Sequence, residues 1–545
     1  MRSNGLFALL LVLAACSVAH AETDIYTNYV EGTWTVAGSP YRVHVEIQVA
    51  ETNTLIIEPG VDVFFDDACG LSLDGCLSAV GTTQDSIRFA AANQFWTGIH
   101  IYGANWDVDS TRIEHCVVTG SSSGGISCET AFRVSVRHCR ISENISDYGG
   151  GILIYDSTPV ITDNLIKNNY SYGNGGGIYV YENSTPLLAR NTIINNECKD
   201  SGGGIGVANC IPLIYGNRIE GNHASYVGGG IFLFNSSAPI VNNIIFNNTG
   251  YLGGGVCVWS GSPPYLTGNL ICNNTGNQGG GLYSYSGNGI SMVNDTVCNN
   301  YAVEGGGICL FQYIDVQAVN CIFWGNQAET YNEVSIGELC TPNFTNCCIE
   351  GGYAYFGGTG MGGYDFNQNV NISTADPQFS NPASGAGAGD HCPASGWKLT
   401  DDSPCIDAGA MTDDPYLQYY DLFGSPRISG GGIDLGAIEW QYGQSDVASE
   451  TLPIPEPALD NFPNPFNPST TLRINLSAAQ AVTLEIFDLR GQKVRAVCSG
   501  NLPEGISTFV WDGTDTRNKP VSSGVYLYRL TVPGNCITKR MLLLK

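Results

Sequence analysis

Aromatic side chains recur at one position of a repeated motif and are the first candidates for binding chemistry. They stand four residues after a glycine triplet, at Tyr155, Tyr181, Phe234, Trp259, Tyr285 and Phe311. Successive side chains of a strand point to opposite faces, and the aliphatic residues after each triplet predict the core face. We therefore expect an outward column of aromatic rings, interrupted by Ala208. Such a column would suit sugar rings or a protein partner, and stabilisation of the sheet by cross-strand pairs is the alternative role.

Charged side chains of the same region do not gather into a catalytic set. A polysaccharide lyase needs carboxylates that hold a metal ion together with a Lys or Arg base, and a glycoside hydrolase needs two facing carboxylates. The candidates fall at different positions of the repeat: Asp156, Asp163, Glu182, Glu220, Lys167, Arg190, Lys199 and Arg218. We predict no catalytic residue, and enzyme activity is the less favoured hypothesis.

His115 and His138 occupy equivalent positions in two neighbouring repeats. Two stacked histidines could hold a metal ion, but a stacked polar pair at the surface is the favoured interpretation. The acidic residues form no regular ligand loop of the kind that binds calcium. We expect neither a metal ion nor another cofactor.

Cysteine usage indicates an oxidising compartment, since the chain has 20 cysteines. Cys272 and Cys298 are one repeat apart, so their separation would allow a disulfide. A pair of buried thiols is an equally good expectation. Cys392 and Cys405 flank an irregular segment and are the stronger disulfide candidates.

The chain is strongly acidic, with 23 Lys and Arg against 50 Asp and Glu and a formal net charge of −27 at pH 7. Nucleic acid is not expected as a partner, because phosphate binding needs clustered cationic side chains. The acidity is typical of a soluble extracellular surface.

A repeat of about 26 residues positions these side chains. Triple glycines end at Gly151, Gly177, Gly204, Gly230, Gly255, Gly281 and Gly307. Asparagine follows the same period at Asn144, Asn169, Asn196, Asn222, Asn248, Asn274, Asn300 and Asn326, and again at Asn164, Asn191, Asn217, Asn243 and Asn269. Units of this length with short apolar strands and no helical period must stack on one another. The sequence predicts an all-β fold, a right-handed parallel β-helix with coils about 4.8 Å apart.

Both markers have a structural explanation. An asparagine at the same place of every coil can hydrogen-bond the backbone of its turn and the asparagines of the coils above and below. Three glycines permit a positive φ or a sharp corner where a Cβ would clash. A phosphate loop is excluded, because neither a Lys-Ser/Thr pair nor a helix follows the glycines.

Residues 1–21 predict a signal peptide. Arg2, the apolar run from Leu6 to Ala15 and Ala19-His20-Ala21 have the form of a cleavable export signal. The stretch that ends at Cys16 also resembles a lipobox, which would make Cys16 a lipidated N-terminus. No later segment approaches the roughly 20 apolar residues that span a bilayer, so no transmembrane helix is expected.

The segments that flank the repeats resemble bacterial secreted and surface β-helix proteins. Gly32-Thr33-Trp34 and Thr54 to Val61 predict strands that enter the first coils. The closing segments that carry the resemblance are Asn320 to Asn326, Asp376 to Phe379, Ser403 to Gly409 and Asp434 to Glu439. Many proteins of this kind degrade pectin or other polysaccharides. The resemblance therefore implies, as the alternative function, a pectate-lyase-like enzyme that acts on an acidic or neutral glycan, within a β-helix domain at residues 22–440.

A second domain is predicted at residues 458–545, after a polar linker at 441–457. Strand-like runs at Thr471–Leu476, Val482–Asp488, Thr508–Trp511 and Val525–Leu530 indicate a small antiparallel Ig-like sandwich.

The same region resembles the type IX secretion C-terminal sorting domain, which is related to the flagellar hook-capping Ig domain. The motifs that match are Asn461 to Pro468, Phe487 to Gln492, Trp511 to Gly513, Ser523 to Tyr526 and Lys539 to Lys545. The resemblance implies the outer-membrane export machinery as a partner and a secreted or cell-surface location. The expected function is a scaffold for binding or adhesion, with a polysaccharide or a surface protein as ligand.

Overall fold

A computed structural model describes residues 22–441 and 458–543. The gaps lie at 104–110, 262, 286, 288, 390–392, 413, 415–416, 418–419, 463–465, 467, 477–479, 489–491, 503–504, 518 and 533–534. The predicted signal peptide, Cys16, Cys392 and almost all of the linker lie outside the described residues. The chain divides into an N-terminal unit that reaches Leu233 and a C-terminal unit from Phe234, to which Leu188–Arg190 and Leu213–Ile219 also belong.

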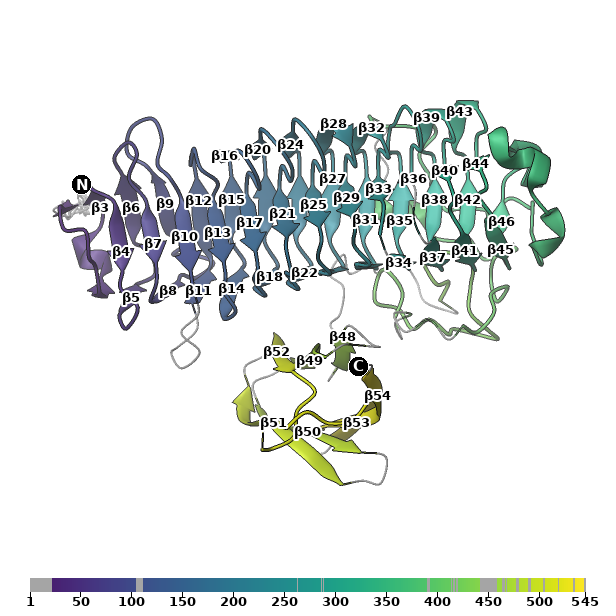
Figure 1. Cartoon of the computed structure of the whole chain (residues 1–545). Helices are drawn as coiled ribbons and strands as arrows, with labels where there is room; N and C mark the ends of the chain where they lie inside the picture. The colour runs from purple at the N-terminus through teal and green to yellow at the C-terminus, as the bar shows by residue number, and fades with distance from the viewer. Residues whose placement is uncertain are drawn as a thin grey trace, which may run out of the picture. The chain divides into compact units, whose positions relative to one another are not determined.

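Short parallel strands recur in three sheets, so the prediction of a β-helix is confirmed (Figure 1). The described strands of sheet A, in order of pairing, are β1 (Thr23–Ile25), β3 (Tyr41–Val43), β6 (Asp62–Phe65), β9 (Ile87–Ala91), β12 (Cys116–Thr119), β15 (Arg140–Ser142), β19 (Leu165–Lys167), β23 (Thr192–Ile194), β27 (Arg218–Glu220), β31 (Ile244–Phe246), β35 (Leu270–Cys272), β38 (Thr296–Cys298), β42 (Ile322–Trp324) and β46 (Cys348–Ile349).

Sheet B contains the strand that follows each glycine triplet. Its described strands are β4 (Ile47–Val49), β7 (Leu71–Leu73), β10 (Ile99–Tyr102), β13 (Ile126–Glu129), β17 (Ile152–Tyr155), β21 (Ile178–Tyr181), β25 (Ile205–Ala208), β29 (Ile231–Phe234), β33 (Val256–Trp259), β36 (Leu282–Tyr285), β40 (Ile308–Gln312), β44 (Val334–Glu338) and β47 (Phe356–Gly357). The first residue after every triplet is buried, as predicted for the core face.

Sheet C completes each coil. Its described strands are β2 (Gly32–Trp34), β5 (Thr54–Ile57), β8 (Cys76–Val80), β11 (Thr111–Glu114), β14 (Val134–Arg137), β18 (Val160–Thr162), β22 (Leu187–Ala189), β26 (Leu213–Tyr215), β30 (Pro239–Val241), β34 (Tyr265–Thr267), β37 (Ile290–Val293), β41 (Val316–Val319) and β45 (Asn343–Thr345). The 3₁₀ helices are η1 (Val36–Gly38), η2 (Gly352–Tyr355), η3 (Thr359–Gly363), η4 (Phe366–Gln368) and η5 (Ala394–Trp397).

A short fourth strand precedes most of the glycine corners, and isolated bridges at Thr275 and Gln278 take its place before Gly279. These strands are β16 (Ile145–Ser146), β20 (Tyr170–Ser171), β24 (Glu197–Cys198), β28 (His223–Val227) and β32 (Thr249–Leu252) in one sheet, and β39 (Tyr301–Glu304) and β43 (Gln327–Thr330) in another. Next to them, the second residue after the triplet, which is the first to point outward, is buried at Tyr179, Phe232, Cys257, Tyr283 and Cys309. Sequence alternation placed these residues on the outward face of sheet B but did not predict that they are covered.

The buried asparagines form the expected ladders. In the N-terminal unit, Asn144 Nδ2 donates to Asn169 Oδ1 (3.0 Å), and Asn169 Nδ2 donates to Asn196 Oδ1 (2.9 Å). Asn169 Nδ2 also donates to the carbonyl of Ile141 in the preceding coil (3.0 Å). The same pattern recurs in the C-terminal unit from Asn248 to Asn274. The structural interpretation of the asparagines is confirmed.

The glycine corners are equally constrained. Gly149, Gly175 and Gly202 have φ values of +63°, +70° and +76°, a region in which a side chain is strained. A Cβ on Gly151 would lie 2.6 Å from the carbonyl oxygen of Gly177 in the next coil. The first glycine of each triplet makes the turn, and the other two allow the coils to approach.

Residues 376–440 cover part of sheet A in the C-terminal unit. Trp397, Leu422 and Leu435 pack in one apolar cluster with Leu270 and Ile322. Further asparagines, which lie at turns with positive φ, attach this cap through its carbonyl oxygens. Asn294 Nδ2 donates to the carbonyl of Asp434 (2.9 Å), for example.

The C-terminal domain is the expected antiparallel sandwich. Its described strands are β48 (Ala458–Phe462), β49 (Thr470–Leu476) and β52 (Gly505–Trp511) in one sheet and β51 (Lys493–Leu502), β50 (Gln480–Asp488), β53 (Gly524–Val532) and β54 (Asn535–Leu543) in the other. A shared core that includes Leu472, Leu484, Trp511 and Leu530 packs between the sheets. The sequence did not predict β48, β51 and β54.

Asp295 takes the place of an asparagine in the second ladder. Its Oδ1 accepts hydrogen bonds from the backbone N of Asn269 (2.7 Å) and from Asn269 Nδ2 (2.9 Å). Its Oδ2 has no partner among the described residues, and burial raises the pKa of Asp295 to about 7. A protonated Asp295 carries an acceptor and a donor, as an asparagine amide does.

We expect the stability of the protein to fall between about pH 4 and pH 7 because of Asp295. Its pKa is raised in the folded state above the unfolded value, so its stabilising effect is complete below about pH 4 and is lost as the pH rises through about 7. The free energy of unfolding should decrease by up to about 4 kcal/mol over this range. Asp295→Asn should reduce this slope and be more stable than the wild type at pH 8. Urea unfolding at pH 5 and pH 8 measures both effects, and an unchanged slope in the variant would contradict them.

Candidate functional site

The structure stacks two of the predicted aromatic side chains in the N-terminal unit. Tyr155 and Tyr181 are register partners on β17 and β21, and their ring centroids are 4.7 Å apart. Both side chains are half-buried, and Ala208 follows them in register, as the repeat predicted.

The other four predicted side chains lie in the C-terminal unit. Trp259 and Tyr285 have ring centroids 4.7 Å apart, and Tyr285 and Phe311 have centroids 5.1 Å apart. Phe234 and Phe311 are each 39 % exposed, whereas Trp259 and Tyr285 are half-buried. Five of the six rings thus stack within one unit or the other, and a binding role for all six side chains stays a prediction.

One buried and one exposed tyrosine, Tyr179 and Tyr148, pack beside these rings in the N-terminal unit. Tyr179 stacks on Tyr181 with centroids 5.2 Å apart, and Tyr148 stacks on Tyr179 at 5.8 Å. Tyr148 is 52 % exposed and belongs to the turn before the glycine corner, on which alternation within strands has no bearing. We call Tyr148, Tyr155, Tyr179 and Tyr181 the tyrosine cluster. Sequence reasoning missed Tyr148, although an aromatic residue directly before a glycine triplet was a signal for it.

Carboxylates lie beside the tyrosine cluster. Glu129 on β13 is the register partner of Tyr155, and Glu182 directly follows Tyr181 and accepts a hydrogen bond from Asn209 Nδ2 (3.1 Å). Burial raises the pKa of Tyr181, and Glu129 and Glu182 raise it further. The outward face of sheet B in this unit thus combines aromatic rings with negative charge.

The two stacked histidines behave as a structural pair. The rings of His115 and His138 have centroids 4.8 Å apart and lie nearly parallel. Burial lowers the pKa of His115, and His138 lowers it further. In the part of the chain that the structure describes, no group of three or more His, Cys, Asp or Glu side chains could hold a metal ion.

A convergent set of carboxylates around an arginine lies in the cap of the C-terminal unit. Arg427 donates through Nη1 to the carbonyl of Gly436 (3.1 Å), and Asp421, Asp434 and Glu439 surround it electrostatically. All four charged side chains are buried, and the carboxylates accept hydrogen bonds from backbone N–H groups of the cap. This cluster therefore holds the cap together and does not face a groove.

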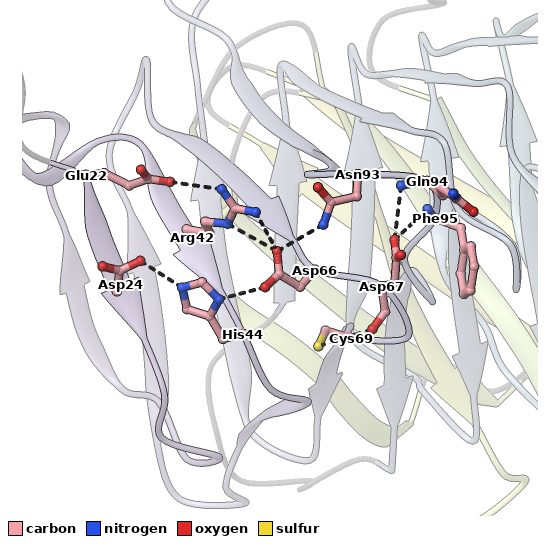
Figure 2. A network of polar contacts seen from close by, with 10 residues as sticks. All are labelled: Glu22, Asp24, Arg42, His44, Asp66, Asp67, Cys69, Asn93, Gln94 and Phe95. Atoms are coloured by element: carbon pink, nitrogen blue, oxygen red, sulfur yellow. Dashed lines mark hydrogen bonds and ion pairs between the residues drawn. The ribbon is translucent and has the colours of Figure 1, made fainter.

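A polar network at the beginning of the β-helix was not expected from the sequence (Figure 2). His44 bridges Asp24 and Asp66 at 2.7 and 2.6 Å, and Arg42 donates to the same Asp66 carboxylate (3.0 Å). Tyr26 stacks on the His44 ring with centroids 4.4 Å apart. Asp24 lies on β1 and Arg42 on β3, while His44 and Asp66 directly follow β3 and β6. The network therefore connects the first strand to the coils that follow.

The network fixes the charges of its members. Hydrogen bonds from Asp24 and Asp66 raise the pKa of His44. Burial opposes ionisation of Asp66, but hydrogen bonds from His44 and Arg42 outweigh it and lower the pKa of this carboxyl. With both His44 nitrogens bonded to carboxylates, the imidazole is not available as a base, so a structural role is favoured.

The disulfide candidates that the structure describes, Cys272, Cys298 and Cys405, are all buried. Cys272 and Cys298 are register partners on β35 and β38, and a disulfide between them and a pair of buried thiols both stay predictions. Cys405 is also buried, close to Cys348 in the same apolar cluster. A disulfide between Cys405 and Cys392 stays a prediction, because Cys392 lies outside the described residues.

Comparison with protein families identifies both parts of the chain. A model described as "Right handed beta helix region" matches residues 97–271, and a model described as "FlgD Ig-like domain" matches residues 466–534. The chain thus contains a right-handed β-helix and a C-terminal FlgD Ig-like domain. A comparison with curated proteins gives no match. Among the described residues, no helix is long and apolar enough to cross a membrane.

Similarities to solved structures are partial. Dimeric latent PorU from Porphyromonas gingivalis is 29% identical over 16% of this chain and 9% of its own, with a TM-score of 0.14. PorZ, a surface component of the type-IX secretion system of the same organism, is 21% identical over 16% of this chain and 11% of its own, with a TM-score of 0.13. The chain spans about a tenth of the length of these two proteins. The periplasmic alginate epimerase AlgG is 13% identical over 63% of this chain and 84% of its own, with a TM-score of 0.33.

We expect His44 and His115 to titrate on opposite sides of the ordinary histidine value of about 6.5. Carboxylate partners raise the pKa of His44, whereas burial lowers that of His115. NMR titration of the imidazole protons, assigned with His44→Gln and His115→Gln, measures both. Asp66→Asn should lower the pKa of His44 and leave that of His115 unchanged. Equal values for the two histidines would contradict the network in Figure 2.

Proposed function

We propose that this chain, a right-handed β-helix followed by a FlgD Ig-like domain, is a secreted or cell-surface protein that binds a glycan along the outward face of sheet B. The observation that carries the proposal is the tyrosine cluster. Tyr148, Tyr155 and Tyr181 face outward on a sheet whose core side is already filled, with Tyr148 52 % exposed, and the buried Tyr179 packs against Tyr148 and Tyr181. Neighbouring aromatic side chains can stack against the apolar faces of pyranose rings, and exposed apolar patches of this kind are typical of binding sites.

The rigidity of the sheet supports the same proposal. Tyr155, Tyr179 and Tyr181 are held by parallel pairing on both neighbouring strands, so their rings need little ordering when a ligand binds. A ligand that extends across successive coils would meet Tyr181, Tyr155 and Tyr102 on strands of sheet B, where Tyr102 is 38 % exposed.

The proposed function does not include catalysis. In the N-terminal unit, the described strands of sheet B from β4 to β25 carry no Lys or Arg that could serve as a lyase base. The convergent cluster around Arg427 is buried within the cap. A lyase mechanism therefore has no Lys or Arg base on the described strands of the proposed binding face.

Export is assigned to the C-terminal domain. Its motifs are similar to those of type IX sorting domains, and the FlgD Ig-like match covers residues 466–534. We propose that outer-membrane export machinery reads this domain and delivers the β-helix to the cell surface or the medium.

We expect substitutions in the aromatic columns to weaken glycan binding. Tyr155→Ala and Tyr181→Ala should each lower affinity by about tenfold, the loss of one stacking contact of about 1.4 kcal/mol. Trp259→Ala and Tyr285→Ala test the column of the C-terminal unit in the same way. Ile56→Ala removes an exposed apolar side chain of sheet C and should leave affinity unchanged. Binding of the purified full chain to a glycan panel is the measurement, and a wild type that binds no glycan would refute the function.

Deletion of Asn461 to Lys545 should leave the β-helix in the periplasm. The truncated chain lacks the domain that we propose the export machinery reads, while the repeats that build the β-helix are retained. Cell fractionation with surface proteolysis, run beside the full chain, measures the location. Normal surface delivery of the truncated chain would show that the domain is only a spacer.

A further inference from the structure

The outward face of sheet B in the N-terminal unit is acidic along several coils. Glu46 and Asp74 flank β4 and β7, Glu129 ends β13, and Glu182 follows β21. The described strands of this face carry one titratable base, His100, whose ring nitrogens bond Ser127 Oγ (3.0 Å) and the carbonyl of Thr97 (2.8 Å).

Three of these four carboxylates accept hydrogen bonds from neutral side chains. Glu182 accepts from Asn209 Nδ2 (3.1 Å), Glu46 accepts from Ser72 Oγ (3.1 Å), and Asp74 accepts from the Gln48 amide. Ion pairs among the described residues of this unit, such as Asp66 with Arg42, involve other acids. Among the described contacts of this unit, none pairs Glu46, Asp74, Glu129 or Glu182 with a cationic side chain.

Aromatic rings and carboxylates converge at the tyrosine cluster. Glu129 lies in register with Tyr155 on one side and with Tyr102 on the other. The pKa of Tyr102 is raised by burial and then by Glu129, Glu46 and Asp74, which indicates that all three carboxylates act at this ring. Aromatic rings with carboxylates beside them favour an ammonium group, through cation–π attraction and a charge-assisted hydrogen bond.

The same arrangement disfavours acidic polysaccharides. A uronate or sulfated chain lying on Tyr155 and Tyr181 would bring its anions next to Glu129 and Glu182. Repulsion between these like charges would lower the affinity. A neutral chain gains the stacking contacts and nothing from the carboxylates. Only a cationic sugar gains from both features of the face.

We infer that the ligand of this face is a polymer of amino sugars with free amino groups. This inference rests on the proposed glycan-binding function and narrows it to one chemical class. The tyrosine cluster provides the stacking surface, and Glu129 and Glu182 bind the ammonium groups of successive sugars.

The test compares three oligosaccharides of equal length with the purified full chain by isothermal titration calorimetry. A glucosamine oligomer is the cationic probe, its N-acetylated form is the neutral probe, and a galacturonate oligomer is the anionic probe. We expect the glucosamine oligomer to bind at least about tenfold more tightly than the N-acetylated form, and the galacturonate oligomer to bind more weakly than either. The preference should decrease as salt is added.

Isosteric variants connect the preference to the site. Glu129→Gln and Glu182→Gln should each reduce the preference for the glucosamine oligomer over its N-acetylated form by at least about threefold. Glu143→Gln removes an exposed carboxylate that follows β15 of sheet A in the same unit, so it measures the effect of net charge alone and should leave the preference intact. Tyr155→Ala should weaken both oligomers. Circular dichroism checks that every variant is folded.

The possible outcomes distinguish failure of the amino-sugar inference from failure of the proposed glycan-binding function. If the neutral or the anionic oligomer binds as tightly as the glucosamine oligomer, the inference is wrong and glycan binding stands. If Glu143→Gln reduces the preference as much as Glu129→Gln does, the attraction comes from the net charge of the chain and the inference is also wrong. If none of the three oligomers binds and a wider glycan panel is also negative, both the inference and the proposed function fail.

Discussion

Each buried asparagine of the ladders is bonded to the coil before it and to the coil after it. Asn169 shows the pattern: its side-chain oxygen accepts from Asn144, and its Nδ2 donates to Asn196 and to the carbonyl of Ile141. A polar amide in an apolar stack is costly unless its donors and acceptor are bonded, so these positions tolerate few replacements. Every coil must also place this amide at the same position relative to the coils on either side. This requirement fixes the backbone conformation at the asparagine and therefore the register of sheet B. The alignment of Tyr155 with Tyr181 depends on that register.

Much of this architecture could be predicted from the sequence, because its causes are local and repeated. The glycine corner needs a positive φ, the residue after it enters the core, and the asparagine recurs with the coil, so Gly151, Ile152 and Asn169 all behave as their spacing indicated. The sandwich was predicted for the same reason, through alternation in β50 and β53. The weaker alternation of the exposed strand β51 explains why it was missed.

The remaining features depend on contacts that no local pattern encodes. Tyr148 joins the tyrosine cluster because the turn before Gly149 lies next to β21 of the following coil, a contact between residues 31 positions apart. His44 meets Asp24 and Asp66 from three separate segments, and Asn294 attaches to a cap residue 140 positions later. In each case the residue types were visible in the sequence, but their partners were set by the stacking of the coils and by the path of the cap.

The pairing of one coil with the next has a genetic consequence. A coil presents the same acceptors to its predecessor and the same donors to its successor, so duplication of a whole repeat inserts a unit that both neighbours already fit. Deletion or insertion of a single residue within a coil is not accommodated in this way, because it moves an asparagine amide out of reach of its ladder partners. Lineages that carry this protein are therefore expected to differ by entire repeats, and each such event lengthens or shortens the aromatic face by one ring.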